Sequence, residues 1–386
     1  VAELALCVPL AIFAGLLVKS FVHLAYLDPG FKADNVLASI IPLSDNRYPT
    51  RESKDLFFHN LLDRLRPLPG VQSAGVVDGV PLSGNISGAY LTVEGQSFSS
   101  LGNDRASAEV FSVSPDYLAT MGIPILRGRG ILERDAASGF KVAVINDLAA
   151  QRYWSGQDPI GKRVSFSGID GPGDWRTIVG IAKATRDSSM DQPPRPALYV
   201  PMEQAPWPAG FLAVRTTGTT IDVTGEIRQQ VAALDKDQPV FLITPMQSLV
   251  DNSIAPRRFS AFLLSIFGAL ATILAALGVY GVVSYSVIQR TREIGVRLAL
   301  GASNRDVLTL VAGQGMRGAI VGVTIGLVVA FALSRFISNL LYGVTAIDST
   351  TFVWIPLVLF TVALVASYLP ARKALRVDPV TALRYE

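Results

Sequence analysis

The chain has 386 residues, of which 50% are hydrophobic and 17% are charged, and its formal net charge is +3. Globular proteins carry about 25% charged residues, so this composition is typical of a protein with part of its surface in lipid. The small net charge requires no nucleic-acid partner. A single cysteine, Cys7, excludes an internal disulfide, and two histidines are too few for histidine-based catalysis or metal binding. We therefore expect no catalytic residue, metal site or cofactor in this chain.

The first apolar segment covers residues 4–18, between Glu3 and Lys19. It is short for a membrane-spanning helix, which needs about 20 residues, but the Lys19 side chain can extend to the membrane surface. We predict a spanning helix within residues 1–27, truncated at its start because the chain is part of a longer protein. A signal peptide is the alternative, weakened because no basic region precedes the segment and no A-x-A site follows it.

Residues 28–255 mix apolar and polar positions and predict a soluble α+β domain. Its first strand, helix and strand resemble the strand, helix and strand at 210–244. These elements predict one subdomain, about 31–105 and 209–252, with a second subdomain inserted at about 106–208. Within this domain we expect a helix over 147–154 capped by Asp147. A further helix over 50–66 is expected to present one face with Leu56, Phe57, Asn60, Leu61 and Leu65.

Three further apolar segments follow in a C-terminal domain, residues 256–386, and predict spans at about 259–288, 316–341 and 349–370. Residues 246–258 are polar and compatible with a helix, except at Pro256. A charged segment, 289–306, separates the second and third spans. The fold class is thus a membrane protein with four transmembrane helices and an α+β domain of two subdomains outside the cytoplasm.

The positions of the basic residues indicate the orientation of these spans. Segment 289–306 has four arginines, and the tail after Pro370 has several more basic residues, whereas the loop at 343–349 has one acid and no base. Positively charged loops lie on the cytoplasmic side. We therefore expect segment 289–306 and the C-terminus in the cytoplasm, and residues 28–255 outside it.

Two glycine-containing patterns, one like a phosphate-binding loop and one typical of helix packing, each allow two interpretations. The segment GQDPIGK at 156–162 matches the start of a phosphate-binding loop, but Arg163 stands where a Ser or Thr must hold magnesium, so a turn is favoured. Small residues let helices in lipid approach closely, and a double GxxxG pattern lies on the third span. It predicts packing within one bundle or, alternatively, a homodimer contact; Gly268 on the second span is the expected partner. The residues of the pattern are Gly318, Gly322 and Gly326.

The segment after the second span is short, amphipathic and carries both charge signs. Its glycines and alanine allow a close approach, and its charges can fix the register of a helix in a groove of another protein. Lipid anchoring by the arginines is the alternative, but an acidic residue between two arginines suits a protein groove better than an anionic lipid surface. The residues concerned are Arg290, Arg292, Glu293, Gly295, Arg297, Ala299, Gly301 and Ala302.

Several stretches together resemble the MacB/FtsX-like permeases of ABC systems. They are RTREIGVRLALGA after a long span, LLYGVTAIDSTTF before the last span, and YLPARKALRVDPVTALRYE at the end. DPGFKADNVL and GQDPIGKRV also fit the extracytoplasmic domain of that family. Within this family, the chain looks like the C-terminal half of a duplicated orphan permease of the acidobacterial type.

The resemblance implies a multi-pass protein of the bacterial inner membrane with four spans, which pairs as a homodimer or as a pseudo-dimer with an N-terminal half. It implies that residues 290–302 form a coupling helix docked on a separate ABC ATPase subunit, which binds ATP. The C-terminal tail from Pro370 is a second, weaker contact. A periplasmic partner of the large domain is also compatible with the resemblance.

The resulting functional hypothesis is a permease subunit that transmits ATP-driven motion to its periplasmic domain for export or extraction of a substrate. The alternative is a membrane regulator or scaffold, similar to FtsX, whose outer domain switches a partner such as a cell-wall hydrolase. A third option is a protein that works without an ATPase.

Overall fold

The computed structural model describes residues 1–95, 106–137, 140–167, 175–205, 210–218, 220–290, 293, 296–297 and 303–374. The chain divides into two compact units. The membrane unit consists of Val1–Tyr26 and Ala255–Glu386, and the sheet unit consists of Leu27–Ile254.

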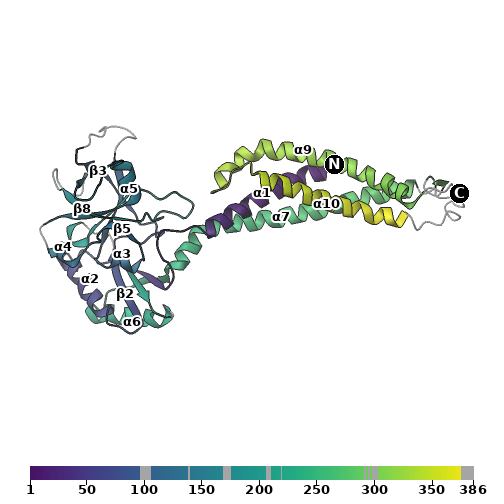
Figure 1. Cartoon of the computed structure of the whole chain (residues 1–386). Helices are drawn as coiled ribbons and strands as arrows, with labels where there is room; N and C mark the ends of the chain where they lie inside the picture. Colours follow the sequence, from purple (N-terminus) through teal and green to yellow (C-terminus); the bar gives the residue numbers. More distant parts are fainter. Residues whose placement is uncertain are drawn as a thin grey trace. The chain divides into compact units, whose positions relative to one another are not determined.

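Four helices form the membrane unit: α1 (Ala2–Ala25), α7 (Met246–Gln289), α9 (Asn304–Ile337) and α10 (Ser349–Ala374). Each contains a segment long and apolar enough to span a membrane, which confirms the prediction of four transmembrane helices. Figure 1 shows these helices running alongside one another. The short 3-10 helix η2 (Ser338–Leu340) follows α9.

The start of α7 differs from the prediction, because Pro256 lies inside the helix. Proline removes one backbone hydrogen bond and usually ends or kinks a helix. Here the residues on both sides are compatible with a helix, and their many backbone hydrogen bonds outweigh the one that is lost.

The strands of the sheet unit follow the order β11-β1-β10-β2-β4-β3-β7-β8-β6-β9, and β5 pairs with β8. Their bounds are β1 Val36–Ile41, β2 Val71–Val77, β3 Ser87–Val93, β4 Ser107–Val113, β5 Ile125–Gly128, β6 Val142–Asn146, β7 Arg163–Ser167, β8 Arg176–Ala182, β9 Ala197–Pro201, β10 Gly210–Thr216 and β11 Phe241–Pro245. The helices are α2 Arg51–Leu65, α3 Tyr117–Thr120, α4 Glu133–Ala137, α5 Asp147–Tyr153, α6 Thr220–Leu234 and the 3-10 helix η1 Met202–Gln204.

The first and last elements of the sheet unit interleave. Strand β1 lies between β10 and β11, and β10 also pairs with β2. The strands between them form the rest of the sheet, and β2 meets β4 at a single pair, Val77 and Val113. Strand β3 belongs by position to the first predicted subdomain, which was expected to end at about residue 105. It pairs with β4 and β7, which both lie in the second predicted subdomain.

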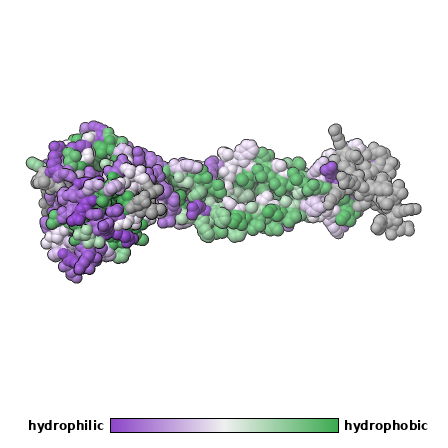
Figure 2. All heavy atoms as spheres, turned by 90° about the horizontal axis from the view of Figure 1, so that it is seen from below, coloured by the Kyte–Doolittle hydropathy of each residue, from purple (hydrophilic) through white to green (hydrophobic). Residues whose placement is uncertain are grey.

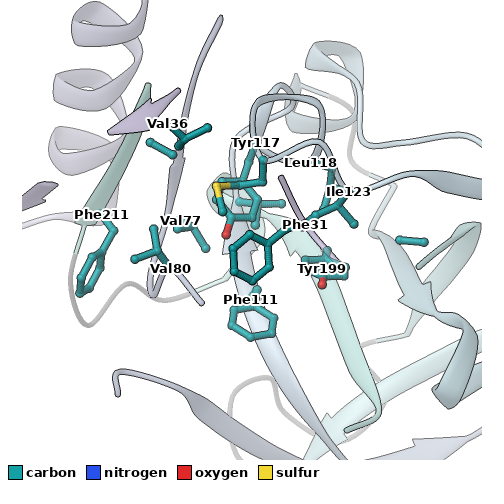
Figure 3. Packing of buried hydrophobic residues seen from close by; sticks show 14 of the residues in the cluster. Phe31, Val36, Val77, Val80, Phe111, Tyr117, Leu118, Ile123, Tyr199 and Phe211 are labelled. Carbon is teal, nitrogen blue, oxygen red and sulfur yellow. The ribbon is translucent and has the colours of Figure 1, made fainter. Parts of the chain in front are cut away.

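Three hydrophobic clusters stabilise the sheet unit. One packs α2 and α6 against β1, β2 and β10, and a second packs α5 against β3, β4 and β6 to β9. The third cluster is drawn in Figure 3 and includes Phe31, Tyr117 and the stacked rings of Phe111 and Tyr199, whose centroids are 5.4 Å apart. Burying such side chains stabilises the fold by about 1.5–3 kcal/mol each.

Two details of the predicted helices are wrong. On α2, Leu56 is 60% exposed and Asn60 is also exposed, whereas Phe58 is buried, because the sheet covers a face rotated from the predicted one. At α5, the cap is Asn146 and not Asp147: the Asn146 side chain accepts a hydrogen bond from the Ala149 backbone N–H at 2.8 Å. Asp147 instead accepts one from the Ala184 N–H, which fixes the chain after β8.

Candidate functional site

The segment that joins α7 to α9 carries the residues predicted to dock a partner. Helix α7 ends at Gln289, and the Arg290 N–H still donates to the Ser286 carbonyl at 3.2 Å. Glu293 and Arg297 form an ion pair of 2.7 Å at the i,i+4 spacing of a helix, and both side chains are nearly half exposed. Their charges are therefore accessible. The other predicted docking residues lie outside the described residues: Arg292, Gly295, Ala299, Gly301 and Ala302.

The predicted packing glycines lie against α1. A Cβ added at Gly326 would lie 2.6 Å from the Val8 Cβ and 3.1 Å from the Ala5 carbonyl oxygen, and one at Gly322 would lie 2.8 Å from the Leu4 Cβ. The absence of a side chain at these positions therefore permits the close approach of α9 and α1.

The other two glycines of the prediction have looser contacts. A Cβ added at Gly318 would lie 3.7 Å from Val1, and one at Gly268 would lie 3.5 Å from the Ala14 Cβ. Gly268 on α7 thus faces α1 and not the glycines of α9 with which it was expected to pair. Helix α1, and not α9, packs against Gly268, because the small residues Ala11 and Ala14 of α1 fit against α7 there.

The loop before α10 is tied to the end of α1. Lys19 donates a hydrogen bond of 2.7 Å to Asp348, and Asp348 also accepts from the backbone N–H and hydroxyl of Thr351. The Lys19 ammonium, followed by Thr351, lowers the pKa of Asp348 to about 2. The Ser20 hydroxyl donates to the Tyr342 carbonyl and accepts from the Tyr342 N–H. We name these five residues the loop clasp.

Sequence reasoning missed the loop clasp. An Asp before Ser-Thr-Thr at the start of a helix is a recognisable N-cap signal, but nothing in the sequence connects it to Lys19. Arg257 makes a similar long-range contact, donating to the Leu340 carbonyl at 2.6 Å. It therefore binds the segment that follows α9.

The sheet unit buries two carboxyl groups that the sequence did not single out. Asp78 and Asp187 are 6% and 4% exposed. The pKa of each is raised to about 7, mainly by burial, and the nearby Glu109 contributes to the shift of Asp187. The Thr185 hydroxyl contacts both oxygens of Asp187, at 2.9 and 2.8 Å, and lies 3.1 Å from the Tyr199 hydroxyl. These acids are therefore held largely protonated below neutral pH.

The remaining features considered in the sequence are the possible phosphate-binding loop and a possible metal site. Residues 156–162 form turns between α5 and β7, with positive φ angles at Gly156 and Gly161, and the chain then enters a strand instead of the helix that a phosphate-binding loop requires. Among the described residues, no group of three or more His, Cys, Asp or Glu side chains is arranged to hold a metal ion.

Comparison with known proteins gives two matching family models. Residues 29–237 match the MacB-like periplasmic core domain, and residues 265–379 match the FtsX-like permease C-terminal model. The first model covers most of the sheet unit, and the second runs from the middle of α7 through α10.

Two relatives illustrate the range of the similarity. The macrolide export ATP-binding/permease protein MacB of Azoarcus sp. (strain BH72) is 27% identical over 298 residues, which cover 71% of this chain and 42% of the relative. The uncharacterized ABC transporter permease YvrN of Bacillus subtilis (strain 168) is 24% identical over 320 residues, covering 79% of this chain and 76% of YvrN. The chain thus spans less than half the length of its MacB relatives.

A crystal structure of the periplasmic region of MacB from Actinobacillus actinomycetemcomitans is also similar, with a TM-score of 0.39 and 16% identity. It covers 58% of this chain and 94% of that one.

The fold and the matched models define an integral membrane protein with a periplasmic core domain between its first two transmembrane helices. Within this class, the chain belongs to the MacB/FtsX-like permease family of ABC transporters, because the periplasmic core model covers more than half of its length and the permease model covers the C-terminal helices. The family and fold class predicted from the sequence are thereby confirmed.

Proposed function

We propose that the chain is a permease subunit of an ABC-type export or extraction system, driven by an ATPase on a separate subunit. In this proposal the chain catalyses no reaction and binds no cofactor. ATP binding and hydrolysis on the partner move segment 289–306, and α7 carries the motion toward the sheet unit. The protein works as a dimer or pseudo-dimer in the bacterial inner membrane, with segment 289–306 and the C-terminus in the cytoplasm.

One observation carries this proposal: exposed charges of opposite sign stand directly after a spanning helix. Glu293 and Arg297 lie one helical turn apart, so their ion pair stabilises a short helix while both groups stay accessible. In water such an exposed pair contributes only about 0.3–0.5 kcal/mol. A partner with complementary charges would gain both orientation and specificity from it. The names of several relatives combine ATP-binding with permease, which supports a motor of this kind.

The test separates docking from helix stability. Glu293→Lys and Arg297→Glu each place two like charges at i,i+4, whereas the double variant Glu293→Arg/Arg297→Glu restores an ion pair with reversed polarity. We expect an ATPase to co-purify with the unmodified protein from native membranes. Both single variants and the double variant should lose its binding and its stimulated ATP hydrolysis.

A matched control reverses an exposed charge in the sheet unit, Arg64→Glu, and should leave both signals unchanged. Failure of any ATPase to co-purify with the unmodified chain would refute the coupling proposal. Full recovery by the double variant would mean that the two residues only stabilise their own helix.

The orientation is tested separately by labelling single cysteines at Ser188 and Ser303 in a Cys7→Ser background. A membrane-impermeant maleimide should label position 188, but not position 303, from the outside of spheroplasts. Labelling at position 303 would reverse the proposed topology.

A further inference from the structure

The sheet unit contains a cavity of about 610 Å³ beside β3 and β4. Residues opposite one another on these antiparallel strands share a face, and here the pairs are Gly88 with Glu109 and Tyr90 with Ser107. Gly88 has no side chain and Ser107 has a small one, so the face is hollow between the Tyr90 ring and the neighbouring strand. The volume lies within the range of about 300–1,000 Å³ that small-molecule sites occupy.

Two arginines line the cavity, and buried polar groups fix the backbone that carries them. The Asn146 side-chain amide, fully buried, donates to the Arg195 carbonyl at 2.7 Å and accepts from the Ala197 N–H at 3.1 Å. The Tyr153 hydroxyl donates to the Ser107 carbonyl at 2.6 Å, which attaches the end of α5, and with it Arg152, to β4. The site is therefore built on rigid elements, as a specific binding site requires.

The charges inside the cavity are incompletely paired. The Arg195 side chain is 61% exposed, and its guanidinium lies 3.9 Å from the nearest Glu109 oxygen, which is longer than a hydrogen bond. The Arg152 guanidinium is 5.8 Å from the centre of the Tyr153 ring and is exposed. Glu109 is almost fully buried at the floor and also lies 3.3 Å from the Ser188 hydroxyl. Both guanidiniums therefore retain donors for a further acceptor.

We propose that this cavity binds a small molecule that carries a carboxylate or phosphate group attached to an apolar ring or chain. Arg152 and Arg195 bind the anionic group, since guanidinium forms strong charge-assisted hydrogen bonds with planar carboxylates and with phosphates. The half-exposed ring of Tyr90 contacts the apolar part. The site is independent of the docking segment and does not require that an ATPase binds the chain.

Binding is measured on the full chain in detergent by saturation-transfer NMR of three probes: benzoate, phenyl phosphate and the neutral benzamide. We expect at least one anion to bind and benzamide to bind roughly tenfold more weakly or not at all, because one charge-assisted contact corresponds to about that factor. The two anions distinguish a carboxylate ligand from a phosphate ligand.

Three variants locate the binding. Arg152→Gln/Arg195→Gln should weaken anion binding roughly tenfold or more. The control Arg64→Gln/Arg228→Gln removes the same charge from two exposed positions on α2 and α6 and should bind as the unmodified chain does. Gly88→Leu keeps both arginines but fills the hollow; its Cβ would have no neighbour closer than the Ala108 carbonyl at 3.9 Å, so the strand can accept it. It should abolish binding.

Two results would overturn the proposal. One is that neither anion binds, or that benzamide binds equally well. The other is that anion binding survives both in Gly88→Leu and in the cavity double variant, which would place the bound anion elsewhere on the protein. Gly88→Leu adds volume without changing a charge, and the arginine double variant removes charge without filling the cavity. If one of these variants misfolds, the other still tests the proposal.

Discussion

The two units of this protein are packed differently. In the sheet unit the large apolar side chains, such as Phe58, Phe111 and Tyr199, lie inside. In the membrane unit, by contrast, many large side chains of α7, α9 and α10 are exposed: Phe262 is 61% exposed and Phe331 is 58% exposed. The large side chains in its interior come mainly from α1, such as Ile12 and Leu16. Many of the buried residues on the other helices are small: Ala275, Ala319, Ala330, Ala363 and Ser367. Figure 2 shows the same contrast at the surface, with hydrophobic residues covering the membrane helices.

The difference follows from the solvent around each unit. Water drives large apolar groups into a core, and each square ångström buried contributes about 25 cal/mol. Lipid provides no such force, so helices in a bilayer associate where small residues allow close contact. The same residue type should therefore have different effects in the two units, and the predictions below test this, from the largest expected effect to the smallest.

The largest contrast is expected between two phenylalanines. Phe111→Ala removes a buried ring stacked on Tyr199 and should destabilise the sheet unit by about 3–5 kcal/mol. Phe262→Ala on α7 removes an exposed ring and should change stability by less than about 1 kcal/mol. Denaturant unfolding of the full chain in detergent measures both. Equal losses for the two variants would contradict the proposed contrast.

The buried acids predict a pH dependence confined to the sheet unit. A carboxyl group whose pKa is raised by folding contributes stability below its unfolded pKa and loses it as pH rises through the folded pKa. For Asp187 this window runs from about 4 to about 7. Stability should therefore fall as pH rises from 5 to 8.

Asp187→Asn cannot ionise and keeps an acceptor for Thr185. It should be more stable than the unmodified chain at pH 8, by at most about 4 kcal/mol for a shift of roughly three pKa units, and similar to it near pH 4. Thermal unfolding at both pH values measures this. Asp45→Asn, at an exposed aspartate paired with Lys54, is the control and should change both values by less than about 1 kcal/mol. A variant less stable than the parent at pH 8 would contradict the prediction.

In the membrane unit, adding a side chain at the contact between α1 and α9 should lower stability, because the helices have no room for the extra volume. Gly326→Leu places atoms within 2.6 Å of Val8 and should destabilise the membrane unit by about 1–3 kcal/mol or more. Gly281→Leu on α7 is the matched control, because a Cβ at that glycine has no heavy atom within 4 Å. The measurement is the fraction of monodisperse protein that remains after heating in detergent. Equal behaviour of the two variants would exclude close packing at Gly326.

The smallest effect is expected at the loop clasp. Asp348→Asn removes the charge that binds Lys19 but keeps an N-cap acceptor for Thr351, so the loss should be about 1 kcal/mol or less. Because Lys19 lowers the pKa of Asp348, the contribution is present above about pH 4 and disappears as pH falls toward 2. A double-mutant cycle with Lys19→Gln measures the coupling, and additive effects would show that the pair contributes nothing.

Sequence patterns predicted much of this structure because they depend on local rules. Charge-free runs predicted four spans, and the strand, helix and strand expected at the start of the soluble domain and again at 210–244 correspond to β1, α2, β2 and to β10, α6, β11. Strand β9 was missed because Pro193, Pro194 and Pro196 precede it and resemble a connector, and β3 was missed because Gly88 and Ser87 weaken its pattern. The docking charges were predicted from their position after a span, and of these Glu293 and Arg297 are seen to be accessible.

The sequence by itself determined the class of the protein, since hydropathy and charge act on segments of about 20 residues and need no knowledge of distant contacts. Only the tertiary structure decided which surfaces meet: that α1 packs against the glycines of α9, that Lys19 pairs with Asp348, and that Asp187 is buried near Tyr199. It also placed Arg152 and Arg195 around one cavity. These residues are far apart in the chain, and their proximity follows from strand order and helix packing, which no local pattern encodes.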